Sequence, residues 1–265
     1  MAADLKSFDR VADCYDATRA LPPDAEAAVA AGIMGALREV APLPTVLEVG
    51  IGTGRIALPL VGAGARVVGL DLAPAMLARL RAKRADVALV IADAARPPLR
   101  AHVFDGAIFV HVLHLLPDAA AALRAATQVV RPGGVLLHGR TDHSESPARL
   151  VIPRVRELVQ ELAGVDLGSG DWHAAADRAF TQHAGEVRAR MTDMVLARWK
   201  ERVTGRALLE TLGRRVYSSS WAIPEAVMPE LLRRLTPWVE ALLGGLDHVI
   251  ESEAAFTLVT ARLPG

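Results

Sequence analysis

Between residues 46 and 137, short apolar runs alternate with longer helical stretches, and this rhythm leaves the chain few possible folds. Each run is too short for a helix and has the nearly continuous apolar character of a strand buried on both faces. Strands that alternate with helices form βαβ units, and therefore a mostly parallel sheet with helices on both faces. The sequence thus predicts a doubly wound α/β fold. The expected strands are 46–49, 66–70, 87–91, 107–112 and 135–137, and the expected helices are 55–63, 74–84 and 118–130.

The rest of the chain is expected to add elements to this one domain rather than to form a second one. The first residues look helical, with a break at Pro22 and Pro23, and they predict an N-terminal arm. After Arg140 the alternation stops, and mainly helical segments follow, with a probable strand near 186–199 and a last strand over 249–262. The predicted parts are an arm at 1–40, a ligand-binding core at 41–140, a helical substrate lid at 141–245 and a final strand at 246–265.

Composition excludes several classes of protein. The 30 basic and 30 acidic residues give a formal net charge of +0, which argues against a general nucleic-acid or membrane-surface binder. The single cysteine, Cys14, cannot form an internal disulfide. The chain has no apolar signal segment at its start and no uncharged apolar run of the ~18 residues that a membrane span needs. We therefore expect a cytoplasmic protein that acts as a monomer or homodimer, without a nucleic-acid or membrane partner.

A glycine-rich turn follows the first expected strand and opens a helix, a position where backbone amides meet nucleotide-like ligands. Its glycines are Gly50, Gly52 and Gly54, whereas the dinucleotide pattern GxGxxG would need a glycine at the position of Arg55. Glu48, beside the turn, would repel a pyrophosphate but suits a ligand that carries an ammonium group and no phosphate. The alternative is a tight turn that needs glycines only for positive φ angles.

Two acidic residues end the next two strands. Asp71 lies 21 residues after Gly50, a distance at which a carboxylate can accept hydrogen bonds from both ribose hydroxyls. Asp93 ends the third strand, where a carboxylate can receive an adenine amino group. Either residue can instead serve as a cap of the turn or helix that follows it.

Taken together, five blocks of sequence resemble the class I methyltransferases, and most closely their small-molecule branch, methyltransferase type 11. The resemblance runs from about residue 8 to 140 and implies a seven-stranded Rossmann-like sheet whose last strand is antiparallel. It also implies S-adenosylmethionine as the cofactor. The blocks are LEVGIGTGR (47–55), GLDLAPAML (69–77), IADAARPPL (91–99), FDGAIFVHVLHLL (104–116) and VVRPGGVLL (129–137).

The resemblance assigns roles to particular residues. The glycine-rich turn and Glu48 would surround the methionine part of the cofactor, and Asp71 would bind its ribose. Tyr15 and Arg19 belong to a segment similar to an arm that in relatives closes over the cofactor, where they would face its carboxylate. The implied cofactor residues are Tyr15, Arg19, Glu48, Gly50, Gly52, Gly54, Asp71, Leu72, Met76, Asp93, Ala94 and Val110.

Methyl transfer from this cofactor to an O, N or C nucleophile of a small molecule depends mainly on alignment. Proximity contributes roughly 7–11 kcal/mol, whereas one general base contributes about 3–5 kcal/mol. His114 is the candidate base and, with His111, a candidate substrate residue, because both follow the fourth strand. Local backbone contacts are the alternative role for each. His138 and Arg140 can also reach the cleft, and no metal is expected.

Large aromatic residues of the later region are candidates for the substrate pocket, since they bury apolar area and also offer a polar atom. Packing between helices is the alternative for each of them. Two other functions stay open: a regulatory protein that holds the cofactor without transferring methyl, and a nicotinamide-dependent oxidoreductase, which Arg55 and Glu48 disfavour. The aromatic candidates are Trp172, Trp199, Tyr217 and Trp221.

Overall fold

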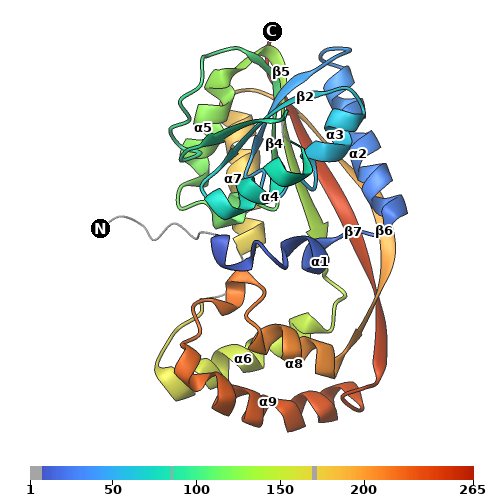
Figure 1. Ribbon diagram of the computed structural model, residues 1–265, viewed down its shortest axis with the longest axis vertical. Helices are drawn as coiled ribbons and strands as arrows, with labels where there is room; N and C mark the ends of the chain where they lie inside the picture. The colour runs from blue at the N-terminus through green and yellow to red at the C-terminus, as the bar shows by residue number, and fades with distance from the viewer. Residues whose placement is uncertain (1–7, 85, 169–171) are drawn as a thin grey trace. The chain divides into compact units, whose positions relative to one another are not determined.

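The computed structural model describes residues 8–84, 86–168 and 172–265. Their centre is a seven-stranded sheet of order β3-β2-β1-β4-β5-β7-β6 (Figure 1). The strand order reverses between β1 and β4, and ligands of open α/β sheets bind at such a switch point. The strands are β1 (Thr45–Val49), β2 (Arg66–Asp71), β3 (Ala88–Ile91), β4 (Phe104–Val110), β5 (Val130–Asp142), β6 (Arg190–Thr204) and β7 (Val249–Arg262).

The first five strands are parallel, as the alternation of apolar runs predicts. Val46 of β1 pairs with Val67 of β2 on one side and with Gly106 of β4 on the other. Val46, Leu47 and Val49 are almost fully buried, which explains the unbroken apolar character of this strand.

The last strand, β7, runs antiparallel to β5. The backbone N–H of Gly133 donates to Pro264 O at 2.7 Å, and that of Leu263 donates to Gly134 O at 2.9 Å. Further along β5, Arg140 O accepts a hydrogen bond from the side chain of Thr257. Partners in β7 thus fall in number as those in β5 rise, which confirms the expected antiparallel strand.

Several helix ends coincide with local signals in the sequence. Pro23 begins α2, and the Asp118 carboxylate accepts from the Ala121 N–H at the start of α5, as helix caps do. Gly164 and Gly244 end α6 and α9 in left-handed conformation. The described helices are η1 (Asp9–Val11), α1 (Tyr15–Arg19), α2 (Pro23–Arg38), α3 (Ala57–Gly62), α4 (Pro74–Lys83), η2 (Leu113–Leu115), α5 (Ala119–Val129), α6 (Ala148–Ala163), α7 (Trp172–Glu186), α8 (Gly205–Gly213), η3 (Ser218–Ser220), η4 (Glu225–Val227) and α9 (Met228–Leu243).

The described residues form two compact units. The first contains the residues up to Thr141 together with Trp172–Ala197 and Phe256–Gly265. In it, α2 and α3 cover one face of the sheet, and α5 and α7 cover the other (Figure 1). The second contains residues 142–168 and Arg198–Ala255, and its core lies among α6, α8 and α9. This core includes Leu158, Val159, Leu209, Leu231 and Leu235.

This division differs from the predicted lid at 141–245. Residues 172–197 belong to the first unit because α7 packs on α5, with Phe180 and Ala184 in the same buried cluster as Leu123. The strand predicted near 186–199 occupies 190–204 instead. Its start is later because α7 continues to Glu186 and the chain then turns at Arg188, which has a φ of +55°. In the described part of the chain, no helix is long and apolar enough to span a membrane.

Candidate functional site

The carboxyl ends of β1, β2 and β4 meet at one edge of the sheet, and the glycine-rich turn closes over that edge. The N–H groups of Gly50 and Ile51 both donate to Leu70 O, at 2.7 and 3.1 Å. The Gly52 N–H donates to Asp71 Oδ2 at 2.8 Å, and Asp71 Oδ1 accepts from the Ala73 N–H at 2.9 Å. The end of β2 therefore fixes the shape of the turn.

A cavity of about 90 Å³ lies beside this turn. Eight of the residues expected to bind the cofactor line it, together with His111, which was expected to contact the substrate. Sequence reasoning missed further lining residues at 8, 49, 70, 92, 112 and 115–117, most of which neighbour the predicted strand ends. All of them except residues 8 and 117 lie within the blocks of sequence that carry the resemblance, where roles were assigned to other residues only. The eight predicted residues are Tyr15, Gly50, Gly52, Asp71, Leu72, Met76, Ala94 and Val110.

The three glycines of the turn have different reasons to be glycine, although each has a positive φ. A Cβ on Gly50 would lie 2.5 Å from a methyl group of Val112, and one on Gly54 would overlap Leu80. Gly52 has a φ of +55°, and its nearest obstacle is the Met76 methyl group at 3.2 Å. Gly52 thus leaves its backbone open toward the cavity, whereas Gly50 and Gly54 allow close packing.

Glu48 is a buried carboxyl group on β1, with 3% of its surface exposed. Its Oε2 atom has no hydrogen-bond partner among the described residues. Burial raises the pKa of Glu48 to about 8; the Arg55 charge opposes this rise and the Asp71 charge adds to it. A buried acceptor without a partner is costly, and a ligand ammonium group would satisfy it. This feature fits S-adenosylmethionine, which carries an ammonium group and no phosphate.

Asp71 also fits a ligand role. Burial raises the pKa of its carboxyl group, against the effect of hydrogen bonds from Ala73 and Gly52. Its two oxygens accept from the backbone N–H groups of Gly52, Leu72 and Ala73, and since a carboxylate offers about four acceptor sites, it can accept a further donor such as a ribose hydroxyl. Asp93, by contrast, accepts from the Ala95 N–H of its own turn at 2.9 Å and does not line the cavity. Its geometry matches the loop cap.

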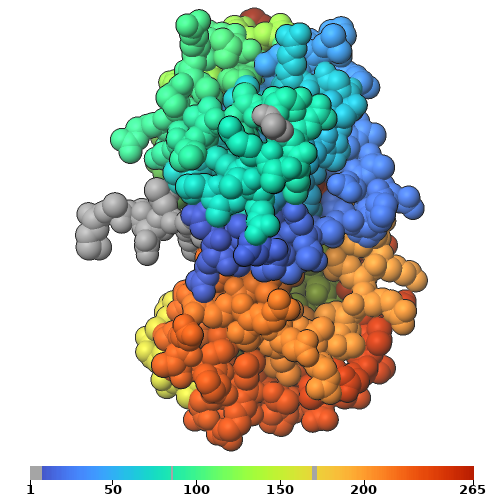
Figure 2. Space-filling model, viewed as in Figure 1, coloured from blue at the N-terminus to red at the C-terminus, as the bar shows by residue number. Residues whose placement is uncertain are grey.

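The N-terminal arm is attached to the glycine-rich turn through Asp16, a residue that sequence reasoning missed. Its carboxylate lies 2.6 Å from Lys83 Nζ and accepts from Thr53 Oγ1 at 2.5 Å. Burial opposes ionisation of Asp16, but the bonds from Lys83 and Thr53 hold its pKa below the usual value. Arg55 also donates to Arg19 O at 2.8 Å. Figure 2 shows the arm, in dark blue, on the surface against the cyan residues of the sheet unit.

The two predicted cofactor residues of α1 lie in different places. Tyr15 lines the cavity and packs edge-on against Phe8, with ring centroids 6.1 Å apart. Burial raises the pKa of Tyr15, against the charges of Arg55 and Arg19. The Arg19 guanidinium lies over the Tyr15 ring, 5.8 Å from its centroid, and does not line the cavity. Its pairing with a carboxylate stays a prediction.

His111 and His114 also differ in position. His111 lines the cavity with a φ of +54°, a conformation rare for residues other than glycine. Its N–H donates to Gly139 O at 3.1 Å, and its Nε2 lies 3.2 Å from Thr141 Oγ1. His114, on η2, stacks with His173 at a ring distance of 4.2 Å and does not line the cavity. The structure thus brings His111 to the cavity.

His138 and Arg140 of β5 both contact Asp177 of α7. His138 is 3% exposed, and its Nε2 lies 3.0 Å from Asp177 Oδ1. Arg140 Nε lies 3.0 Å from Asp177 Oδ2. Burial opposes ionisation of Asp177, but these two partners keep its pKa below the usual value. This triad joins α7 to the sheet. Among the described residues, no group of three or more His, Cys, Asp or Glu side chains could hold a metal ion.

The aromatic candidates for substrate contact do not line the cavity. Trp172, at the start of α7, is 37% exposed. The other three belong to the second unit, where Trp199 Nε1 donates to Glu201 at 3.1 Å and Trp221 Nε1 donates to Arg215 O at 2.9 Å. Tyr217 is 47% exposed. A role of these residues toward the substrate stays a prediction.

Comparison with known proteins finds a family match over the core of the sheet. Residues 47–138 match the family described as methyltransferase domain, of type 11. This match agrees with the resemblance of the sequence to the class I S-adenosylmethionine-dependent methyltransferases. The matched segment of the chain begins in β1 and ends in β5, and it contains the glycine-rich turn, Asp71 and His111.

Named relatives match only part of the chain. It is 34% identical to malonyl-[acyl-carrier protein] O-methyltransferase of Serratia marcescens over 131 residues, which is 49% of each chain. It is 36% identical to demethylmenaquinone methyltransferase of Mycolicibacterium vanbaalenii over 99 residues, 37% of this chain and 42% of the relative. The chain thus spans about half the length of these relatives or less.

A solved structure shares the fold over most of the chain. It is a protein from Anabaena variabilis, described as a methyltransferase from an antibiotic biosynthesis pathway, with a TM-score of 0.59. The match covers 89% of this chain and 96% of that one at 14% identity. At this identity the likeness supports the Rossmann-like fold alone.

Proposed function

We propose that this methyltransferase transfers the methyl group of S-adenosylmethionine to a small organic acceptor that carries an oxygen, nitrogen or carbon nucleophile. One observation carries the proposal: the cavity at the end of β1 is bordered by Gly52 and Asp71, and Glu48, on β1 itself, has a buried carboxyl oxygen without a partner among the described residues. A ligand with a ribose and an ammonium group matches these polar groups.

The cofactor supplies a reactive methyl group on a sulfonium. The protein has to bind the cofactor and the acceptor, orient them, and exclude water. Asp71 and the glycine-rich turn would hold the cofactor, while Tyr15 would cover it from the arm. The apolar lining, including Met76 and Val110, would keep the reaction site dry, which strengthens the polar contacts that remain. Alignment of this kind is worth roughly 7–11 kcal/mol and makes a base optional.

We assign the acceptor-facing position to His111. Non-glycine residues held in left-handed conformation cost about 1–3 kcal/mol, and they cluster at functional sites. The Thr141 hydroxyl and the edge of the Phe256 ring, at a centroid distance of 6.0 Å, restrain the His111 imidazole. A restrained imidazole at the cavity wall can accept a proton from a hydroxyl or amine. His114 remains the second candidate for this role.

Relatives narrow the class of acceptor. One relative is named demethylmenaquinone methyltransferase and another ubiquinone biosynthesis O-methyltransferase, and these names point to partly apolar acceptors. We propose an acceptor of that kind, with a hydroxyl, amine or activated carbon next to an apolar body.

The test is formation of S-adenosylhomocysteine when the protein is incubated with S-adenosylmethionine and a panel of phenols, amines and quinols. Turnover with any acceptor supports the enzyme. Tight cofactor binding without turnover across the panel would favour the alternative of a regulatory protein. Preference for a nicotinamide nucleotide over S-adenosylmethionine in a binding screen would overturn the proposal.

Two matched variants then distinguish the role of His111 from that of His114. Asparagine tolerates left-handed backbone, so His111→Asn removes the imidazole without new strain, and His114→Asn is its control. If His111 accepts the proton, His111→Asn should lower kcat by roughly 10²–10⁴-fold, with cofactor affinity unchanged. A loss confined to His114→Asn would move the role to His114.

A further inference from the structure

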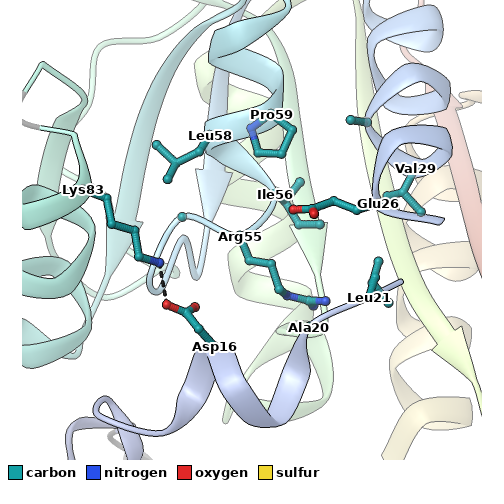
Figure 3. A pocket seen from close by; sticks show the side chains of 12 residues that line it. Asp16, Ala20, Leu21, Glu26, Val29, Arg55, Ile56, Leu58, Pro59 and Lys83 are labelled. Atoms are coloured by element: carbon teal, nitrogen blue, oxygen red, sulfur yellow. Dashed lines mark ion pairs between the residues drawn. The ribbon is translucent and has the colours of Figure 1, made fainter. Parts of the chain in front are cut away.

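A second cavity, of about 210 Å³, lies on the other side of the glycine-rich turn, where the arm and α2 face α3 and α4 (Figure 3). It shares none of its lining residues with the cavity at Asp71. None of the roles assigned so far uses it.

Four charged residues line this second cavity, and they fall into two groups. Asp16 and Lys83 pair with each other at 2.6 Å, and Lys83 also donates to Thr53 O at 2.9 Å. Glu26 and Arg55 are not joined by an ion pair in the described part of the chain, although both side chains extend into the cavity from opposite walls (Figure 3). One anion and one cation therefore face the same space without neutralising each other.

Neither the Glu26 carboxylate nor the Arg55 guanidinium has all of its hydrogen-bonding groups paired with described residues. The Glu26 carboxylate, on α2, has no hydrogen bond or ion pair with any residue that the structure describes. The Arg55 guanidinium carries five donors, and one of them binds Arg19 O. Both side chains are half-buried, so a ligand that reaches them would bind in a partly desolvated place, where charge-assisted hydrogen bonds are strong.

The rest of the wall is apolar. Leu21, Val29, Leu58 and Pro59 contribute side chains to it. A ligand that uses both charges and this wall has to carry a cationic group, an anionic group and an apolar part.

We propose that this cavity is a second ligand site for a free α-amino acid with an aliphatic side chain. Its ammonium group pairs with Glu26, its carboxylate with Arg55, and its side chain packs on the apolar wall. The guanidinium suits this task because its planar donors match a carboxylate.

The site also connects the arm to the turn. Asp16 and Arg55 line the cavity, and the same two residues hold α1 against the turn through Thr53 and Arg19. A ligand that bridges these walls stabilises the attached arm, whose Tyr15 lines the other cavity. Because coupling between sites is reciprocal, the amino acid and S-adenosylmethionine should each tighten the binding of the other.

Calorimetric titration with L-leucine tests the first part, with two analogues as controls. L-Leucinamide lacks the carboxylate and 4-methylpentanoate lacks the ammonium group. The protein should bind L-leucine with at most millimolar Kd and each analogue at least about tenfold more weakly, as expected for the loss of one charge-assisted contact. Equal binding of all three compounds, or no binding of L-leucine at millimolar concentration, would overturn the proposal.

Substitutions on α2 test where L-leucine binds. Glu26→Gln should weaken L-leucine binding about tenfold or more, while Asp24→Asn, an exposed carboxylate on the same helix, should leave it unchanged. Ala30→Phe fills the cavity and should abolish binding, whereas Ala27→Phe on the exposed side of α2 should not. Circular dichroism confirms that each variant is folded, and L-leucine binding that survives Ala30→Phe in a folded protein refutes the location.

A final titration distinguishes this site from the cofactor site. Asp71→Ala should lose cofactor affinity and keep L-leucine binding. Displacement of L-leucine by S-adenosylmethionine in the unaltered protein would mean that both occupy one site, and the proposal would then fail even if the methyltransferase activity stands.

Discussion

Replacement of Glu48 by glutamine tests the central electrostatic feature of the cofactor site. The carboxyl group is 3% exposed, one of its oxygens has no partner, and burial raises its pKa to about 8 from an ordinary value of 4.5. Since a tenfold change in proton affinity is worth about 1.4 kcal/mol, ionised Glu48 destabilises the cofactor-free protein by on the order of 4–5 kcal/mol.

The sign of the pH dependence follows from proton counts. Between pH 4.5 and about 8, the folded protein holds the Glu48 proton and the unfolded chain releases it, so the free energy of unfolding falls as the pH rises. Below this range both states are protonated and the cost is absent. Glu48→Gln cannot ionise, and it should therefore gain stability relative to the unaltered protein as the pH rises through this range.

In the cofactor-free protein, burial favours the protonated form of Glu48. Cofactor binding should favour the carboxylate instead, because an ammonium group beside Glu48 stabilises its negative charge. At pH 7 a group of pKa about 8 is protonated in about nine molecules of ten, so binding should release up to about 0.9 proton. Glu48→Gln should release none and bind S-adenosylmethionine at least about tenfold more weakly, as expected for a lost charge-assisted contact.

Two assays check these expectations. Urea unfolding at pH 5, 7 and 9 measures stability, with Glu39→Gln, an exposed site, as the control. Calorimetry in buffers of different ionisation enthalpy counts the protons released on binding. Equal proton release by the protein and by Glu48→Gln, or a stability difference that does not grow with pH, would show that Glu48 is not the titrating group and does not face the ammonium.

Three further predictions use calorimetry with S-adenosylmethionine. Asp71→Ala should weaken binding at least about tenfold. Asp93→Ala should change it less than about threefold, because the Asp93 carboxylate caps its own turn. A larger effect of Asp93→Ala would mean that Asp93, not Asp71, contacts the cofactor. Gly52→Val should abolish binding, since a branched side chain at φ +55° strains the turn and projects toward the cavity; retained affinity would place the ligand elsewhere. Asp16→Asn should weaken binding roughly three- to tenfold by loosening α1, and unchanged affinity would mean that the arm takes no part.

The sheet could be predicted from the sequence because its strands are buried on both faces and therefore uniformly apolar. The extents of β5 and β6 could not. β5 begins at Val130 and includes Arg131 and Pro132, residues that no apolar run contains. β6 has mostly exposed or half-buried residues, so neither apolar continuity nor clear alternation marks where it begins.

The division of the later region was also beyond the sequence. The residues of α7 have the pattern of an ordinary amphipathic helix. Contacts between residues far apart in sequence, such as Phe180 with the cluster around Leu123 and Asp177 with His138, assign them to the sheet unit. In the same way, Asp16 meets Lys83 and Thr53 across a gap of 37 residues or more. One signal was available: Lys83 is one of only three lysines in the chain, and it lies in the last turn of the helix predicted over 74–84.

The glycine-rich turn shows why a motif locates a site without identifying which of its residues touch the ligand. Spacing along the chain predicts that three glycines form one functional group, but each faces a different neighbour in space. Gly50 meets Val112 from the end of β4, and Gly54 meets Leu80 from α4, so both serve packing between elements far apart in sequence. Gly52 has more space: its nearest obstacle is the methyl group of Met76, a cavity-lining residue, at 3.2 Å. A substitution at Gly50 or Gly54 should therefore destabilise the fold, whereas one at Gly52 should mainly affect the ligand.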